Sequence, residues 1–172
     1  MNYLEKFRNV EHFIFDIDGV MTDGQIILHP NGLWLRSLNV RDGFAIRTAT
    51  TKGYRVAVIS GGTTPGAMDR FDDLGVHDVY LGVNDKVVAY EHFLEKNNLS
   101  GENLLYMGDD LPDYQVMERV GLAACPSNAV DEIRDLSHYV SPLAGGEGCV
   151  RDVIEKVLKL RNEWPGYPSI KL

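Results

Sequence analysis

Short apolar runs separated by polar breakers recur along the chain, and such runs are typical of buried strands in a parallel sheet. Four of them cover residues 13–15, 56–59, 104–107 and 121–124. Helix-like stretches cover residues 43–52, 65–74, 85–98, 112–120 and 148–161. Because strands alternate with helices, the pattern predicts an α/β fold with a three-layer, doubly wound, Rossmann-like parallel sheet. Active residues should then gather at the carboxyl ends of the strands.

One segment interrupts the alternation and predicts a β-hairpin inserted directly after the first strand. Residues 25–29 and 33–38 are strand-like, and Pro30, Asn31 and Gly32 join them. Asn-Gly between two such runs is a strong hairpin signal. We expect a flap over about residues 25–38 that rises above the active edge of the sheet.

Length and composition predict a single domain over residues 1–172 and exclude several kinds of partner. Apolar residues make up 44% of the chain, enough for a sizeable core. A net charge of -8 argues against nucleic acid, because phosphate backbones need clustered Lys and Arg. No segment approaches the ~18 apolar residues of a membrane helix, and no signal peptide is visible, so we expect no membrane partner and a cytoplasmic protein. Prolines and a glycine exclude regular helix from the tail, about residues 162–172, which is either frayed or an ordered arm against a neighbour.

Two groups of aspartates follow apolar runs, at the points where the predicted strands end. Asp16 and Asp18 come directly after the first run, where burying carboxylates without a partner is costly. Asp109, Asp110 and Asp113 follow the third run. Turn formation or helix capping accounts for one such acid but hardly for three beside a second acidic strand end. Since both groups can meet at one crevice, they predict a site for Mg²⁺ and a phosphate.

Two further positions complete the predicted site. Ser60 ends the second strand and precedes Gly61, so its hydroxyl and the flexible backbone amides could donate hydrogen bonds to phosphate oxygens. Lys86 opens the longest predicted helix and could neutralise a phosphate. Taken singly, an ordinary turn serine and a surface lysine are the alternatives.

Together these residues resemble the four motifs of the haloacid dehalogenase superfamily. The motifs are Asp16-x-Asp18-Gly19, Ser60-Gly61, Lys86 and Gly108-Asp109-Asp110-x-x-Asp113, in this order and roughly at the family's intervals.

The resemblance implies a magnesium-dependent phosphatase. Asp16 would be the nucleophile that forms an aspartyl-phosphate, and Asp18 would protonate the leaving alkoxide and then activate water. Mg²⁺ would be held by Asp16, Asp109 and the backbone carbonyl of Asp18, with Asp110 and Asp113 in support. Lys86 would bind the phosphoryl group together with Ser60 and Gly61. It would also be catalytic, because its positive charge offsets the repulsion between the Asp16 carboxylate and the phosphate.

Segments around the motifs are similar to the 3-deoxy-D-manno-octulosonate 8-phosphate phosphatases, namely residues 18–24, 39–46 and 145–152. This resemblance implies a homotetramer acting in lipopolysaccharide biosynthesis on a phosphorylated sugar acid. The intervals between the motifs leave no room for a large cap domain, so the site is expected to close by oligomerisation, with the flap over a neighbouring subunit.

The choice of substrate stays open in the sequence. Arg41 could bind the substrate carboxylate, or it could pair with Asp42 or another acid in a structural role. Many family members have an arginine after the Ser-Gly pair, whereas Gly62 stands here. The alternatives are therefore a phosphatase for 3-deoxynononate 9-phosphate or another sugar phosphate and, from another class, a non-catalytic oligomeric binding module.

Overall fold

The architecture is a six-stranded sheet in a computed structural model that describes residues 3–63 and 66–166. The strands lie in the order β5-β4-β1-β6-β7-β8, and every neighbouring pair is parallel. Their bounds are β1 His12–Phe15, β4 Arg55–Ile59, β5 Asp78–Tyr80, β6 Leu104–Met107, β7 Leu122–Cys125 and β8 Tyr139–Val140. The predicted parallel sheet is confirmed. The edge strands β5 and β8 are short and partly exposed, so they carry no apolar run of the kind that marks the central strands.

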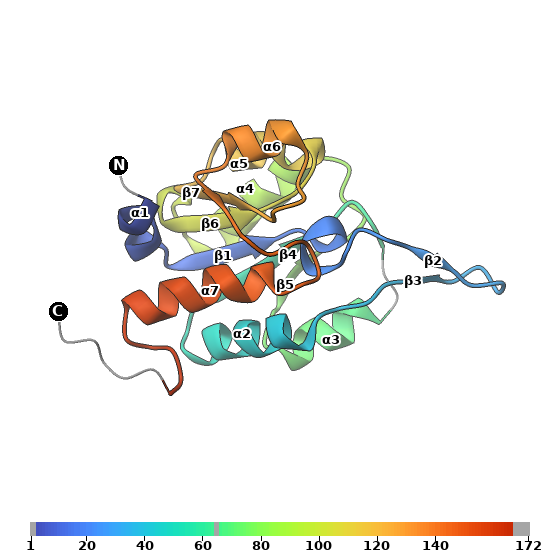
Figure 1. Cartoon of the computed structure of the whole chain (residues 1–172), viewed down its shortest axis with the longest axis horizontal. Coiled ribbons are helices and arrows are strands. Elements are labelled where there is room, and N and C mark those ends of the chain that lie inside the picture. The colour runs from blue at the N-terminus through green and yellow to red at the C-terminus, as the bar shows by residue number, and fades with distance from the viewer. Residues whose placement is uncertain (1–2, 64–65, 167–172) are drawn as a thin grey trace.

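Helices cover both faces of this sheet and make three layers (Figure 1). One face is packed against α1 Tyr3–Asn9, α2 Val40–Thr51, α3 Ala67–Asp73 and α7 Cys149–Leu160. The other is packed against α4 Lys86–Asn97, α5 Tyr114–Met117 and α6 Asp131–Leu136. In β1, Phe13 and Phe15 belong to the first core and Ile14 to the second, because successive side chains of a strand point to opposite faces.

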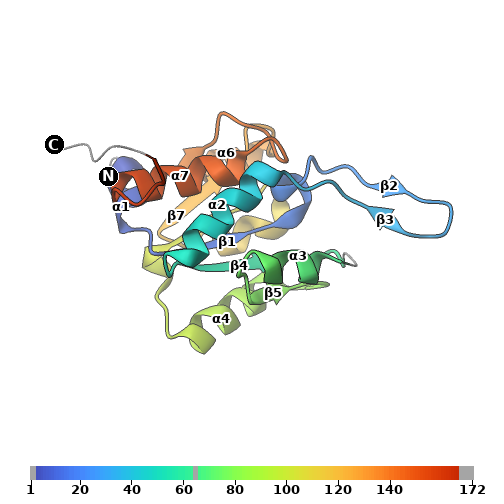
Figure 2. The ribbon, with the colours of Figure 1, turned by 90° about the horizontal axis from the view of Figure 1, so that it is seen from below.

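The pairing of α2 with α7 shows how the sequence builds one of these layers. Buried residues of α7 recur at helical spacing, namely Val150, Val153, Ile154, Val157 and Leu158. The stripe faces the sheet, and α7 runs alongside α2 (Figure 2). Burying each such side chain stabilises the fold by about 1.5–3 kcal/mol.

Most predicted helices are present, with changes at their ends. The predictions over residues 43–52, 85–98 and 148–161 correspond to α2, α4 and α7. The prediction over 112–120 is too long, because the 3₁₀ turn Leu111–Asp113, capped by Asp110, precedes a shorter α5. The prediction over 65–74 corresponds to α3, although Pro65 lies outside the described residues. Residues 162–166 of the predicted tail are not helical, and the remainder of the tail also lies outside the described residues.

The predicted hairpin is present and projects away from the sheet (Figures 1 and 2). Its strands β2 (Ile27–Leu28) and β3 (Trp34–Leu35) pair antiparallel. Among the described residues, the connections between the strands of the main sheet hold the layer helices, short 3₁₀ or π turns and this hairpin, so the predicted fold without a large cap is confirmed. Within the same residues, no helix has the length and apolar character needed to cross a membrane.

Candidate active site

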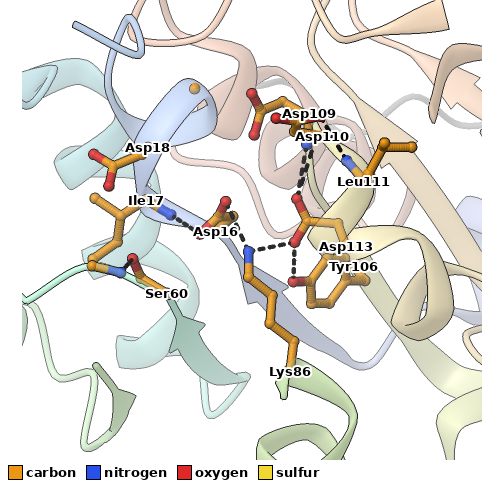
Figure 3. Close-up of polar contacts among 12 residues, drawn as sticks. Asp16, Ile17, Asp18, Ser60, Lys86, Tyr106, Asp109, Asp110, Leu111 and Asp113 are labelled. Carbon is orange, nitrogen blue, oxygen red and sulfur yellow. Dashed lines mark hydrogen bonds and ion pairs between the residues drawn. The ribbon is translucent and has the colours of Figure 1, made fainter. Parts of the chain in front are cut away.

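Three adjacent strands bring the predicted site residues to one edge of the sheet. Asp16 follows β1, Ser60 follows β4 and Asp109 follows β6, while Lys86 is the first residue of α4 (Figure 3). The chain leaves β1 toward β4 on one side and later returns to β6 on the other, so the crevice lies where the strand order reverses. A cavity of about 310 Å³ opens there. Its lining includes every predicted site residue except Arg41.

Lys86 joins two buried carboxylates in this cavity. Its Nζ lies 2.9 Å from Asp16 Oδ2 and 2.6 Å from Asp113 Oδ1. The Asp85 side chain caps α4 by accepting a hydrogen bond from the Val87 amide, which fixes Lys86 at the start of the helix. Although burial acts to lower it, the pKa of Lys86 is raised by the charges of Asp113 and Asp16. Lys86 is therefore a buried cation rather than a surface lysine.

Both carboxylate oxygens of Asp113 already accept two hydrogen bonds each. Its Oδ1 accepts hydrogen bonds from Lys86 Nζ and from the hydroxyl of Tyr106, both at 2.6 Å. Its Oδ2 accepts from the backbone amides of Asp109 at 3.1 Å and Asp110 at 3.5 Å. These four bonds hold the loop after β6, which makes Asp113 a support for the acidic cluster rather than a free ligand. The Tyr106 hydroxyl is a part of the site that an apolar run does not reveal.

The acidic cluster is a suitable place for a divalent cation. Side-chain oxygens of Asp16, Asp109 and Asp113 lie within 4.8 Å of one another. Burial, followed by the charge of Asp113, raises the pKa of both Asp16 and Asp109 to about 7. Crowded, poorly solvated carboxylates are costly as anions unless a cation offsets their charge, and hard oxygen donors are the ligands that Mg²⁺ takes. With Asp113 saturated, Asp16 and Asp109 are the side chains that could hold Mg²⁺. The backbone carbonyl of Asp18 as a further ligand stays a prediction.

Gly19 permits the close approach of the two acidic loops. Its φ is +82°, a conformation that L side chains rarely adopt. A Cβ at this position would lie inside the van der Waals surface of the Asp109 carboxylate, with even the more distant oxygen only 2.8 Å away. The glycine of the Asp-x-Asp-Gly motif is thus needed to bring Asp109 to Asp16.

Ser60 and the glycines after it form the opposite wall. Ser60 is buried, and its hydroxyl accepts a hydrogen bond of 3.1 Å from the Gly62 amide. Gly61 also lines the cavity. A hydroxyl with adjacent backbone amides is an arrangement that can bind phosphate oxygens.

Asp18 lies on the same wall, and its carboxylate is held by a residue that the sequence patterns do not single out. Arg36, just after β3, donates from Nε to Asp18 Oδ1 at 2.6 Å and from Nη2 to Oδ2 at 3.1 Å. A side chain 18 positions along the chain, beyond a hairpin, has no local signal that would connect it with Asp18.

Arg41 is the predicted site residue that lies elsewhere. It lines a separate cavity of about 520 Å³ beside α7, whose lining also includes Arg151 and Glu155. Its predicted partner Asp42 instead accepts a hydrogen bond of 2.7 Å from the Arg151 amide. The assignment of Arg41 to a substrate carboxylate therefore stays a prediction, without support from the lining of the acidic cavity.

An acidic crevice at the switch point of a parallel sheet, with a buried lysine and a serine wall, defines a hydrolase of the haloacid dehalogenase-like class. The sequence pattern of the haloacid dehalogenase-like hydrolases matches residues 75–151. The chain is 40% identical to the 3-deoxy-D-manno-octulosonate 8-phosphate phosphatase of Escherichia coli strain K12 over 155 residues, which are 90% of this chain and 82% of that protein.

Solved structures agree with the sequence comparison. The crystal structure of the phosphatase with the same name from Yersinia pestis superposes with a TM-score of 0.93 at 35% identity, covering 99% of this chain and 92% of that one. The enzyme of that name from Moraxella catarrhalis, crystallised with a magnesium ion, a phosphate ion and a KDO molecule, gives a TM-score of 0.90 at 31% identity and covers 94% of each chain. The chain belongs to the 3-deoxy-D-manno-octulosonate 8-phosphate phosphatase family, and it is a phosphatase.

Proposed function

We propose that the chain hydrolyses 3-deoxy-D-manno-octulosonate 8-phosphate in a Mg²⁺-dependent reaction, through an aspartyl-phosphate on Asp16. The observation that carries the proposal is the juxtaposition of Asp16 with Lys86 and Asp109 at the base of an open cavity. Relatives named for this substrate at 36–40% identity over most of the chain support it. So does the Moraxella catarrhalis structure, whose bound ions match the chemistry of the acidic cluster.

The proposed reaction proceeds in two steps. An oxygen of Asp16 attacks phosphorus while the ester bond breaks, and Asp18 gives its proton to the leaving oxygen. Water then attacks the phosphorus of the aspartyl-phosphate, Asp18 takes up the proton of that water, and the Asp16 carboxylate is released with inorganic phosphate. Lys86, with Ser60 and Gly61, holds the transferred phosphoryl group throughout.

Charge neutralisation makes this attack feasible. A carboxylate and a phosphate repel each other, and Lys86 at 2.9 Å from Asp16 offsets part of that repulsion. When bound at Asp16 and Asp109, Mg²⁺ would supply further positive charge at the transferred phosphoryl group.

We propose a homotetramer as the assembly, with the hairpin as part of the interface between copies. Ile27, Leu28 and Trp34 are 65%, 70% and 56% exposed, although they are large and apolar. Several large apolar side chains left exposed on one hairpin favour an interaction site there. Replacing Leu28 by Asp should dissociate the assembly in light scattering. A wild-type chain that is monomeric and fully active would contradict this part of the proposal.

The proposed setting is lipopolysaccharide biosynthesis in the cytoplasm, with no nucleic acid or membrane partner. The relatives named for the octulosonate phosphate support the pathway. Cys125 and Cys149 are both free, as is usual in a reducing compartment.

A phosphate-release screen tests the proposed activity. The panel holds the eight-carbon and nine-carbon sugar-acid phosphates and simple sugar phosphates, each with and without Mg²⁺. We expect the highest kcat/KM with the octulosonate phosphate, no turnover without a divalent cation, and no turnover by Asp16→Asn. A preference of more than tenfold for the nononate would select the alternative substrate, and binding without turnover would select the binding module.

A further inference from the structure

Among the described residues, the buried side chain of Arg36 hydrogen-bonds to one group, the Asp18 carboxylate. Its side chain is only 4% exposed, and both of its bonds go to the Asp18 carboxylate. Its remaining terminal nitrogen, Nη1, is buried without a hydrogen-bond partner in the described part of the chain. A buried donor without a partner costs about 1–3 kcal/mol, so this arrangement does not serve stability alone.

Gly62 provides the space that the guanidinium occupies. A Cβ at this position would lie 3.0 Å from Arg36 Nη2 and 3.0 Å from Asp18 Oδ2, closer than ordinary contacts. It would also lie 3.5 Å from the hydroxyl of Ser60. The paired side chains therefore lie against Gly62 at the wall of the cavity, beside the predicted phosphate-binding serine.

We infer that Arg36 is the positioning residue of Asp18, and that it holds this carboxyl group in place for proton transfer to the leaving oxygen. The inference rests on the proposed function and extends it to a residue outside the four motifs. As Asp18 gives up its proton, negative charge develops on its carboxyl group. The guanidinium already donates to both oxygens of that group, so it stabilises the developing charge without having to move.

The position of Arg36 in the fold connects proton transfer with the hairpin. Arg36 is the residue after Leu35, the last residue of β3. The Asp18 side chain is 34% exposed, and within residues 3–63 and 66–166 its carboxylate accepts hydrogen bonds from Arg36 alone, so its orientation depends on where the hairpin places Arg36. Misplacement of a reacting group by about 1 Å can lower a rate on the order of 100-fold.

The test is the dependence of kcat/KM on the leaving group, measured with para-substituted phenyl phosphates and benzyl phosphate in the presence of Mg²⁺. A 4-nitrophenolate ion leaves with little help from an acid, whereas phenol, with a pKa near ~10, and benzyl alcohol need a proton. For Arg36→Ala we expect less than about a 3-fold loss with 4-nitrophenyl phosphate and about a 10- to 100-fold loss with the other two. Asp18→Asn should show the same pattern more strongly, and Arg36→Lys should recover part of the loss.

Controls separate positioning from damage to the fold or to substrate binding. Arg134→Ala, which removes an exposed arginine on α6, should leave both kinds of ester unaffected. On the octulosonate phosphate, Arg36→Ala combined with Asp18→Asn should be no slower than Asp18→Asn alone, because Arg36 acts only through Asp18. Equal losses of Arg36→Ala on all esters, or a further loss in the double variant, would overturn the inference while leaving the proposed function intact. A wild-type chain inactive on every phosphomonoester would overturn both.

Discussion

Replacement of Gly19 by Ala tests how the site is assembled, because this glycine lies in the loop after β1 and faces Asp109 in the loop after β6. The added Cβ would lie within 2.8 Å of both carboxylate oxygens of Asp109. Ordinary carbon contacts begin near ~3.5 Å, so the carboxylate must retreat by about 1 Å or more. Bonds from Mg²⁺ to oxygen are about 2.0–2.1 Å long with little tolerance, so a displaced Asp109 could no longer share an ion with Asp16.

The expected effect has two parts that a matched variant separates. An L residue at positive φ costs about 1–2 kcal/mol of stability wherever it stands. Gly53→Ala carries the same backbone strain, since φ at Gly53 is +90° and a Cβ there would meet nothing within 4 Å. Gly19→Ala should lose at least as much unfolding free energy as Gly53→Ala in urea titrations, because it adds the cost of moving Asp109 to the same backbone strain.

Only Gly19→Ala should lose metal affinity, on the order of 10- to 100-fold, the loss typical when a metal ligand is no longer held in place. Calorimetric titration with Mg²⁺ measures this affinity, and phosphate release at saturating Mg²⁺ measures the remaining activity. Gly53→Ala should bind and turn over like the wild-type chain. Wild-type Mg²⁺ affinity in Gly19→Ala would refute the reasoning.

Three further substitutions test other parts of the account. Burial raises the pKa of Asp42 to about 6 in the folded chain, above its usual value of about 4 in the unfolded chain. The contribution of Asp42 to the unfolding free energy, relative to Asn, is therefore greatest below about pH 4 and is lost as the pH rises through 6. The difference in unfolding free energy between Asp42→Asn and wild type should thus move in favour of the variant by about 3 kcal/mol from pH 4 to pH 7, and parallel curves would contradict this. Tyr106→Phe removes a 2.6 Å bond to the Asp113 carboxylate and should cost about 1.5–3 kcal/mol in urea unfolding; a change within error would show that Lys86 alone suffices. Gly145→Ala drives a Cβ into the backbone carbonyl oxygen of Gly19 and to 2.8 Å from that of Thr22, neither of which can move aside as a side chain can. It should lower the melting temperature through a loss of about 1–3 kcal/mol, and an unchanged temperature would mean that this loop is adjustable.

The sequence was sufficient to predict the central sheet and the acidic cluster, because both depend on local rules. Each central strand contains a continuous apolar run; Asp16 comes directly after one of them, and Asp109 follows another with only Gly108 between. Parallel strands place their carboxyl ends at one edge, so the convergence of these acids follows from chain order alone. The same rule places Ser60 on the opposite wall.

The remainder depends on contacts between distant segments, which local patterns do not encode. The pairing of Arg36 with Asp18 depends on how the hairpin folds back, and no spacing rule connects the two positions. The direction of Arg41 depends on how α2 packs against α7, where the Arg151 amide, not Arg41, binds Asp42. Tyr106 lies within an apolar run, so its hydroxyl bond to Asp113 could not be separated from core packing.

The central claim is that Asp16 itself becomes phosphorylated, and acid quenching of the enzyme during turnover tests it most directly. The octulosonate phosphate is mixed with the enzyme and Mg²⁺, the reaction is stopped in acid, and peptides are examined by mass spectrometry. The account predicts a phosphoryl group on the peptide that contains Asp16, and none in Asp16→Asn. Full turnover by Asp16→Asn, with no phosphorylated peptide in either protein, would contradict it.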